Sequence, residues 1–294
     1  MSKRPVSPGM EKILGEKFNV LDYGFVRVVD YMGNDAAIVQ AARVSYGEGT
    51  KSVSSDEALI NYLMRNWHSS PFEMCEIKIH VKLPIFVARQ WIRHRTANVN
   101  EVSARYSVLA KEFYIPQPEN ICSQPKNNKQ GRGEAVPRDF GVEAAEIFQS
   151  QMFNAYSAYE DLLNGPDAPN YIEEMPSIAR ELSRIVLPSS IYTEWYWKVD
   201  LHNLMHFLQL RTNPHAQMEI RVYADALLNI LGCWVPMTYR AFRDKRLEAF
   251  TLTGNMVEYL RTILRADSID DQNRAENRLS RREKQEMMDA LSIS

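Results

Sequence analysis

Residues 77–83 alternate strictly between apolar and polar side chains, and this alternation constrains the fold more than any other feature of the chain. The apolar members are Ile77, Ile79, Val81 and Leu83, and the polar members are Lys78, His80 and Lys82. Because successive side chains of a strand point to opposite faces of its sheet, the pattern predicts a half-buried strand. Pro84 follows and suits the first turn of a helix, which we expect to run toward Arg95.

A second alternating run covers residues 191–199, but here bulky side chains occupy both faces, which predicts a strand covered on both sides. Asp200 is then placed to cap a helix over residues 201–210. The other predicted elements are a short strand over residues 112–115, a loop over residues 116–141, and helices over residues 143–163, 176–188 and 214–231.

Residues 90–107 fit neither a helical nor a strand pattern beyond Arg95, so we expect a helix end that runs into a long polar loop. The segment is rich in arginine, and Arg93, Arg95 and Arg105 each offer a planar fork of donors suited to phosphate or carboxylate oxygens. The Ser103 hydroxyl and the backbone N–H groups after it could cradle a phosphate. The alternative is a solvated basic loop with internal ion pairs.

Composition and charge exclude several classes of protein. The chain has 294 residues, of which 45% are hydrophobic, so it can bury a core in one large domain or two small ones. A net charge of −2 gives no bulk attraction to nucleic acid or to a membrane. No apolar run is long enough to span a bilayer, and residues 1–17 are polar and lack the apolar stretch of a signal peptide. Three cysteines without a CxxC motif favour a reduced, cytoplasmic setting without structural zinc.

The order of residues in the arginine-rich segment resembles the signature of the flavin-dependent thymidylate synthases, which is Arg-His-Arg, seven residues and then Ser. Here the signature is formed by Arg93, His94, Arg95 and Ser103. The resemblance continues through further segments in the expected order and covers about residues 18–242. These segments are residues 85–91, 113–116, 184–188 and 210–217.

The resemblance implies an α+β fold with a mixed β-sheet flanked by helices, in a single domain over residues 18–244. A polar tail over residues 1–17 and a charged helical extension over residues 245–294 would flank it. It also implies a homotetramer with sites shared between subunits. The implied reaction is the reductive methylation of dUMP to dTMP, with 5,10-methylenetetrahydrofolate as carbon donor and FAD, reduced by NADPH, as hydride source.

The resemblance also assigns roles to individual residues. The nucleotide dUMP would be bound by Gln90, Trp91, Ile92, Arg93, Glu101, Val102, Ser103, Ala104, Arg105, Arg184 and Arg211. FAD would be bound by Ser70, Arg93, His94, Arg95, Glu101, Asp200, His202 and His206, and the folate by His68 and Tyr106. Arg211 would be catalytic, facing the pyrimidine edge and stabilising negative charge on the ring.

Other interpretations remain open at this point. His202 and His206 have the spacing of a metal pair, but the glutamate of an HExxH motif is replaced by Asn203, and we expect no metal. Arg184 and Arg211 lie near predicted helix ends, where a cation is favoured by the helix dipole alone. The rival functions are a non-catalytic nucleotide- or RNA-binding module that uses the same arginines, and a histidine-dependent metal hydrolase.

No cysteine has a sequence environment that favours a nucleophilic thiolate. Cys75 lies between Glu73 and Glu76, Cys233 lies in an apolar run, and Cys122 lies in the predicted loop. Nearby negative charge and burial both oppose ionisation of a thiol. We therefore expect that no enzyme cysteine attacks the substrate.

Overall fold

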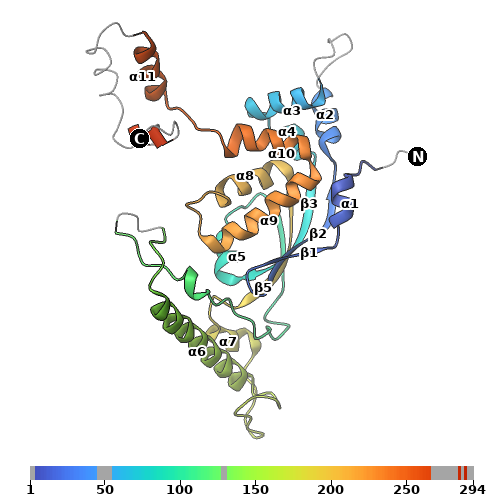
Figure 1. Ribbon diagram of the computed structural model, residues 1–294. Coiled ribbons are helices and arrows are strands. Elements are labelled where there is room, and N and C mark those ends of the chain that lie inside the picture. The colour runs from blue at the N-terminus through green and yellow to red at the C-terminus, as the bar shows by residue number, and fades with distance from the viewer. Residues whose placement is uncertain (1–3, 45–54, 127–130, 266–283, 286–287, 290–294) are drawn as a thin grey trace. The chain divides into compact units, whose positions relative to one another are not determined.

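The computed structural model describes residues 4–44, 55–126, 131–265, 284–285 and 288–289. The chain divides into two compact units, residues 1–242 and residues 243–294. The first unit is built on a five-stranded sheet (Figure 1). Its strands, in their order across the sheet, are β1 (Lys17–Val20), β2 (Gly24–Met32), β3 (Glu76–Pro84), β5 (Tyr192–Asp200) and β4 (Asn98–Glu101).

The α+β class is confirmed, but the described strand pairings are all antiparallel, so the expectation of a mixed sheet was wrong. Two parallel neighbouring strands need a crossover connection, which returns the chain to the end of the sheet at which the first strand began. The helices between β2 and β3 make no such crossover, because Met32 at the end of β2 pairs with Glu76 at the start of β3.

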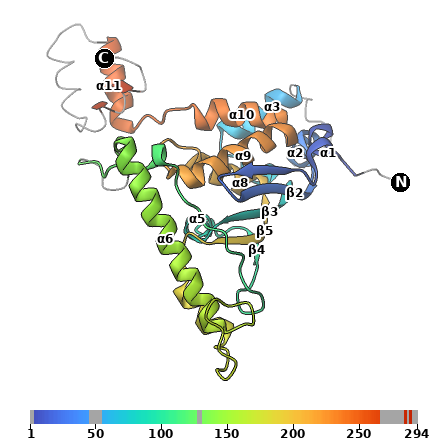
Figure 2. The same ribbon diagram turned by 60° about the horizontal axis from the view of Figure 1, so that its bottom comes forward.

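The alternation that predicted β3 is present in the structure. Ile77 is 1% exposed, and Ile79, Val81 and Leu83 are 0% exposed, whereas the intervening polar residues are only partly buried. Helices α8 (Leu201–Arg211) and α9 (Met218–Trp234) lie over the apolar face of the sheet (Figure 2). The strand β5 is less covered than predicted, because Tyr196 on its polar face is 41% exposed.

Trp91 is the centre of the core between the sheet and the helices. It ends α5 (Ile85–Trp91), is 0% exposed, and packs its ring against Trp197 and Phe207 at centroid distances of 5.4 and 4.6 Å. Burying aromatic rings of this size contributes a large share of the hydrophobic stabilisation of a core. The end of α5 is thereby fixed against the sheet.

The remaining helices of the first unit include one within the expected N-terminal tail. They are α1 (Pro8–Ile13), α2 (Asp35–Arg43), α3 (Asp56–Arg65), α4 (Ser70–Glu73), α6 (Arg138–Leu163), α7 (Arg180–Ser183) and α10 (Pro236–Phe242), with 3₁₀ turns η1 (Pro118–Asn120) and η2 (Arg184–Val186). Met10 on α1 is 0% exposed, and the Ser7 hydroxyl donates to the Cys233 carbonyl at 2.9 Å, so α1 is docked on α9. The second unit contains a π-helix, η3 (Arg243–Leu247), and α11 (Gly254–Arg265).

Two predicted elements differ from the structure. The polar loop after Arg95 contains β4, which pairs with β5 although all four of its side chains are exposed. In the region predicted as a helix over residues 176–188, the Ile178 N–H donates to the Leu162 carbonyl at the end of α6, so the helical part begins only at Arg180. In both places a distant backbone group supplies the hydrogen bond that local sequence cannot indicate.

The predicted helix cap at Asp200 was confirmed, whereas the predicted strand over residues 112–115 was not. Asp200 caps α8 by accepting from the Asn203 N–H at 2.8 Å. The predicted strand over residues 112–115 is reduced to one bridge between Phe113 and Ile191. No helix in the described ranges is both long and apolar enough to cross a membrane.

Candidate functional site

The residues around the Arg-His-Arg sequence form a pocket of about 290 Å³, which we call the arginine–histidine pocket. It is lined by Arg93, His94, Arg95, Thr96, Trp197, Val199, Asn203, His206, Leu210 and Arg211. The chain enters it where α5 ends, because the His94 N–H turns back to the Trp91 carbonyl at 3.0 Å. The segment directly after α5, the strand β5 and the helix α8 therefore supply its walls.

Arg211 and His94 are joined at the centre of this pocket. The Arg211 Nε donates to His94 Nε2 at 3.1 Å, and its Nη2 donates to the Gln90 carbonyl at 3.4 Å. Burial, followed by the charges of Arg211 and His206, lowers the pKa of His94 to about 4. The ring is therefore neutral at pH 7, with its proton on Nδ1 and its Nε2 free to accept from the arginine.

The donor set of this pocket fits a phosphorylated ligand. Of the described residues that line it, none is a carboxylate, so the charges of Arg93, Arg95 and Arg211 are not cancelled within the pocket. Arginine forks match phosphate oxygens in a bidentate manner. A volume of about 290 Å³ holds only part of a dinucleotide such as FAD, so the remainder would lie outside the pocket.

The other part of the signature forms a separate structure, the Ser103 turn, which comprises residues 103–107. The Tyr106 and Ser107 N–H groups donate to the Ser103 carbonyl at 3.0 and 3.1 Å, and the Ser103 hydroxyl accepts from the Arg105 N–H at 3.3 Å. Ala104 is 9% exposed and packs in a small second core with Tyr156 and Tyr159 of α6. This packing fixes the turn beside α6.

The basic residues at the Ser103 turn are held by surface interactions. Arg105 Nε donates to Glu181 at 3.1 Å, and Arg180 Nη1 donates to the Tyr106 carbonyl at 2.9 Å. Arg184 begins η2 directly after α7, on which Arg180 and Glu181 lie. Arg105 is therefore paired with a residue outside its loop, whereas the alternative left open by the sequence was ion pairs within the loop.

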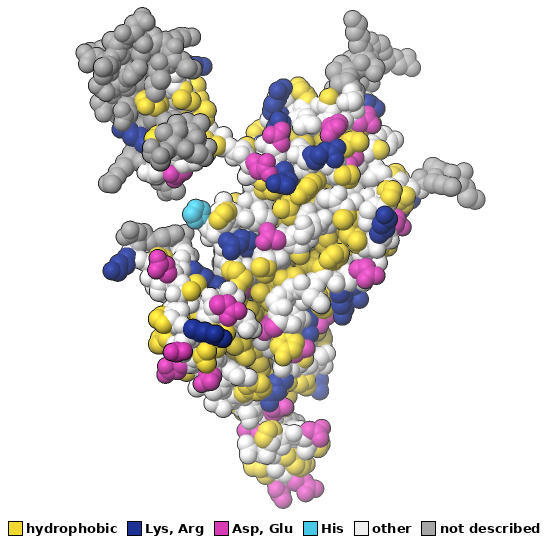
Figure 3. All heavy atoms as spheres, in the orientation of Figure 1, with side chains coloured by type: hydrophobic (Ala, Val, Ile, Leu, Met, Phe, Trp, Pro, Cys, Tyr) yellow, Lys and Arg dark blue, Asp and Glu magenta, His cyan; other side chains and the backbone are white. Residues whose placement is uncertain are grey.

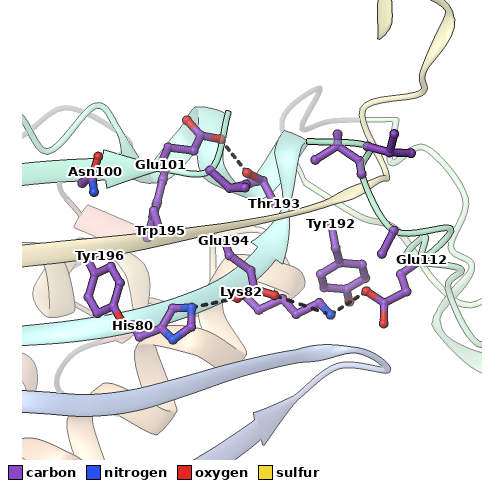
Figure 4. A pocket seen from close by; sticks show the side chains of 14 residues that line it. His80, Lys82, Asn100, Glu101, Glu112, Tyr192, Thr193, Glu194, Trp195 and Tyr196 are labelled. Atoms are coloured by element: carbon purple, nitrogen blue, oxygen red, sulfur yellow. Dashed lines mark hydrogen bonds and ion pairs between the residues drawn. The ribbon is translucent and has the colours of Figure 1, made fainter. Parts of the chain in front are cut away.

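A second pocket, of about 480 Å³, lies on the polar face of the sheet (Figure 4). Glu101 lies at its edge, where its carboxylate accepts from the Thr193 hydroxyl at 2.7 Å, and Val102 lines it as well. Figure 4 shows Lys82 between Glu112 and Glu194, with Nζ–oxygen distances of 2.5 and 3.8 Å. Most of the charge in this sheet-face pocket is thus already paired.

The other residues predicted to bind a ligand lie on α8 or at its N-cap, and at the break between α3 and α4. Both carboxylate oxygens of Asp200 are used within α8, by the Asn203 backbone N–H at 2.8 Å and its side-chain amide at 2.7 Å. His202 is half-buried one turn before His206. His68 and Ser70 are exposed at the break between α3 and α4, and α4 packs on α8.

Trp91 and Ile92 differ in what they can offer a ligand. The Trp91 side chain is 0% exposed, so only its backbone is available for a contact, whereas Ile92 is 39% exposed. His202 and His206 gain no third ligand, since the described residues contain no cluster of three or more His, Cys, Asp or Glu that could hold a metal ion.

Sequence reasoning missed several residues that contact the predicted ligands. Arg180 and Glu181 hold Tyr106 and Arg105, and Gln217 accepts from the Gln90 side chain. Gln217 lies in one of the segments that carry the family resemblance, which was the available signal. Arg180 and Glu181 showed none, because their partners are 74 and 76 residues away.

Comparisons with known proteins show which family the chain is similar to. The family described as thymidylate synthase complementing protein matches residues 27–237. Proteins named flavin-dependent thymidylate synthase are similar over nearly the whole chain. One from Ruegeria pomeroyi is 55% identical over 99% of this chain and 93% of its own length, and one from Rickettsia conorii is 50% identical over 98% and 97%. The structure of the UMP/dUMP methylase PolB from Streptomyces cacaoi bound with 5-Br UMP aligns with a TM-score of 0.68 at 32% identity, covering 78% of this chain and 98% of PolB.

Proposed function

Because the chain belongs to the family of flavin-dependent thymidylate synthases, we propose that it converts dUMP to dTMP by reductive methylation. The carbon donor is 5,10-methylenetetrahydrofolate, and NADPH provides the reducing equivalents through FAD. The observation that supports this most directly is the arginine–histidine pocket, in which a neutral His94 holds Arg211 among further arginines and no lining residue of the described chain is a carboxylate.

Arg211 is the proposed catalytic residue. Methylation of a uracil ring requires that the ring carbon become nucleophilic, so negative charge develops on the ring. A fixed guanidinium stabilises this charge more than a mobile one, because it needs no reorganisation as the reaction proceeds. His94 and the Gln90 carbonyl fix Arg211 by accepting from two of its nitrogens.

The remaining residues bind and orient the ligands in this proposal. Reduced FAD, when bound, supplies the hydride. FAD is held by Ser70, Arg93, His94, Arg95, Glu101, Asp200, His202 and His206, and the folate by His68 and Tyr106. The nucleotide is held by Gln90, Trp91, Ile92, Arg93, Glu101, Val102, Ser103, Ala104, Arg105, Arg184 and Arg211.

We further propose a homotetramer with sites shared between subunits. The proposed nucleotide ligands fall into two groups on different elements, Arg93 and Arg211 in the arginine–histidine pocket and Arg105 and Arg184 at the Ser103 turn. On α6 only three residues are buried, and its exposed apolar side chains include Phe140, Ile147, Phe148 and Phe153. Figure 3 shows hydrophobic side chains on this part of the surface, as expected of a face that another subunit covers.

We also propose which domain carries the site and in which compartment the protein works. The domain over residues 18–244 carries the site, and the protein works in the cytoplasm. Free thiols at Cys75, Cys122 and Cys233 support a reducing compartment.

The test of the function is a spectrum followed by an assay. The purified protein, loaded with FAD, should show flavin absorption that bleaches on addition of NADPH, and should then form dTMP from dUMP and the folate. Protein that is colourless and cannot be reconstituted with FAD would contradict the proposal. For the shared site, inactive Arg93→Ala and Arg184→Ala variants should regain activity when mixed and reassembled, whereas inactive hybrids would contradict it.

A further inference from the structure

A buried carboxylate lies two residues after Gln217, at the start of α9, and the proposed reaction does not use it. Glu219 is 1% exposed. One oxygen accepts from the Tyr114 hydroxyl at 2.9 Å, and the other accepts from Arg132 Nη2 at 2.6 Å and from Gln217 Nε2 at 2.9 Å. Burial by itself raises the pKa of this carboxyl, but the hydrogen bonds from Arg132, the backbone and Gln217 outweigh it and leave the pKa below its usual value. Glu219 is therefore ionised and can only accept hydrogen bonds.

The charge on Glu219 determines the orientation of two side-chain amides. Gln217 must turn its NH₂ group to the carboxylate, so its carbonyl oxygen points the other way. That oxygen accepts from the Gln90 Nε2. Gln90 in turn must present its own NH₂ group to Gln217, which leaves its carbonyl oxygen and one N–H for another partner.

Gln90 is tied to the arginine–histidine pocket at the same time. Its backbone carbonyl accepts from Arg211 Nη2 at 3.4 Å, and Arg211 lines the pocket. The row of Arg132, Glu219, Gln217 and Gln90 therefore leads from a buried charge to the edge of the site.

We propose that Glu219 is a positioning residue that acts through Gln217 to fix the amide of Gln90, and that this orientation selects a uracil ring over a cytosine ring. The inference rests on the proposed function, in which a uracil nucleotide lies beside Gln90. Uracil carries a hydrogen on N3 next to carbonyl oxygens, whereas cytosine has a bare N3 next to an amino group. An amide that offers its oxygen to N3–H and its N–H to the C4 carbonyl pairs with uracil, and both contacts are mismatched with cytosine, which has a bare N3 and an amino group on C4.

A purely structural role explains the arrangement less well. In the Arg132–Glu219 pair the Glu219 side chain is buried whereas the Arg132 side chain is 36% exposed. The buried carboxylate carries a desolvation penalty, and a packed apolar side chain of similar volume is often as stable. An apolar side chain, however, cannot supply a group that only accepts hydrogen bonds and so fixes the orientation of the Gln217 amide. A site rejects an analogue strongly when the analogue leaves a buried polar group of the site without its hydrogen-bond partner.

The experiment compares dUMP and dCMP binding to the full-length, FAD-loaded protein by calorimetry. The wild-type protein should bind dUMP more tightly. In Glu219→Gln the amides can reverse, and in Gln217→Leu the connection to Gln90 is cut while the Arg132–Glu219 pair remains. In both variants the ratio of dUMP to dCMP affinity should fall by about tenfold, the effect of one hydrogen bond and its unpaired partner. Glu57→Gln, which alters an exposed pair with Arg240, is the matched control and should leave the ratio unchanged.

The outcomes separate this inference from the proposed function. Wild-type protein that binds FAD and both nucleotides equally would overturn the inference alone, whereas protein that binds neither nucleotide would contradict the proposed function as well. If the wild type prefers dUMP and Gln217→Leu weakens both nucleotides equally, Glu219 serves packing alone and the inference is overturned. Flavin content and thermal unfolding show whether Glu219→Gln is folded, and Gln217→Leu decides the question if it is not.

Discussion

The arginine–histidine pocket and the Ser103 turn hold the same kind of side chain in opposite ways. In the pocket, Arg211 donates to a neutral ring and to a carbonyl, so its charge is not cancelled by these partners. At the turn, Arg105 is paired with Glu181, and the two side chains are 55% and 53% exposed. Exposed ion pairs contribute little to stability, so Arg105 can exchange its carboxylate for a ligand. The difference indicates that Arg211 is held in place before a ligand binds, whereas the Arg105 side chain takes its final orientation when it binds one.

The largest effect should follow from changing the arginine that is already fixed. Arg211→Lys keeps the charge but loses the planar fork that bonds to His94 and Gln90. We expect turnover to fall by about 100-fold or more, as on removal of a preorganised donor, with folding and flavin content unchanged. Single-turnover dTMP formation measures this. Arg240→Lys is the control, and a near-normal rate for Arg211→Lys would contradict the catalytic role.

Changing the arginine at the Ser103 turn should weaken the binding of dUMP but not the binding of FAD. Arg105→Ala should weaken dUMP binding about tenfold to a hundredfold, because a charge-assisted hydrogen bond contributes about 1.5–3 kcal/mol. FAD affinity should change far less. Glu181→Ala should leave dUMP affinity within about threefold of wild type, since it removes only the exchangeable partner. Equal losses for both ligands in Arg105→Ala, or a large loss in Glu181→Ala, would remove the distinction between the two regions.

A smaller effect concerns the pH dependence of stability that His94 confers. Its pKa in the folded protein is about 4, below the ordinary 6.5, so the unfolded chain takes up the proton first as pH falls. The stability linked to neutral His94 is complete above pH 6.5 and is lost progressively as pH falls from about 6.5 toward about 4. His94→Gln should therefore flatten the pH dependence of urea unfolding in that range. The exposed His215→Gln is the control, and an unchanged slope for His94→Gln would show that the ring is not held neutral.

The smallest effect on turnover is expected from the thiols. Cys75 is 0% exposed, and burial, followed by the charge of Asp35, raises its pKa to about 12. The sequence had suggested opposition from Glu73 and Glu76, so the expected direction holds for a different physical reason. A folded, FAD-loaded variant with Ala at Cys75, Cys122 and Cys233 should keep most of its turnover and lose only some stability from imperfect packing. Loss of all turnover, with recovery on restoring one cysteine, would identify that cysteine as a nucleophile.

Local patterns predicted the parts of the molecule that local forces determine. The alternation at residues 77–83 and the cap at Asp200 are each a relation between near neighbours, and both are present. The three residues of the Arg-His-Arg sequence likewise meet in one pocket. The hydrogen bond from Arg211 to His94 joins residues 117 positions apart, so no pattern of neighbouring residues could have predicted it.

The missed features share a dependence on distant partners. The strand β4 is exposed on both faces, so no alternation marks it, and its backbone is ordered by the edge of β5. Arg132 and Glu219 are 87 residues apart, and each alone resembles an ordinary surface charge. A single sequence therefore indicates candidate ligand residues more readily than the residues that orient them.

The docking of α1 on α9 has a consequence for how the chain is made. The Ser7 N–H donates to the Tyr31 hydroxyl of β2, so α1 can contact β2 early. The hydrogen bond from Ser7 to Cys233 joins residues 226 positions apart and cannot form while the residues between them are being synthesised. At cellular rates of about 5–20 residues per second, this interval lasts on the order of ten to forty-five seconds. Met10, which is 0% exposed in the folded protein, lies on this helix. The docking of α1 on α9 therefore comes after its contact with β2 has become possible.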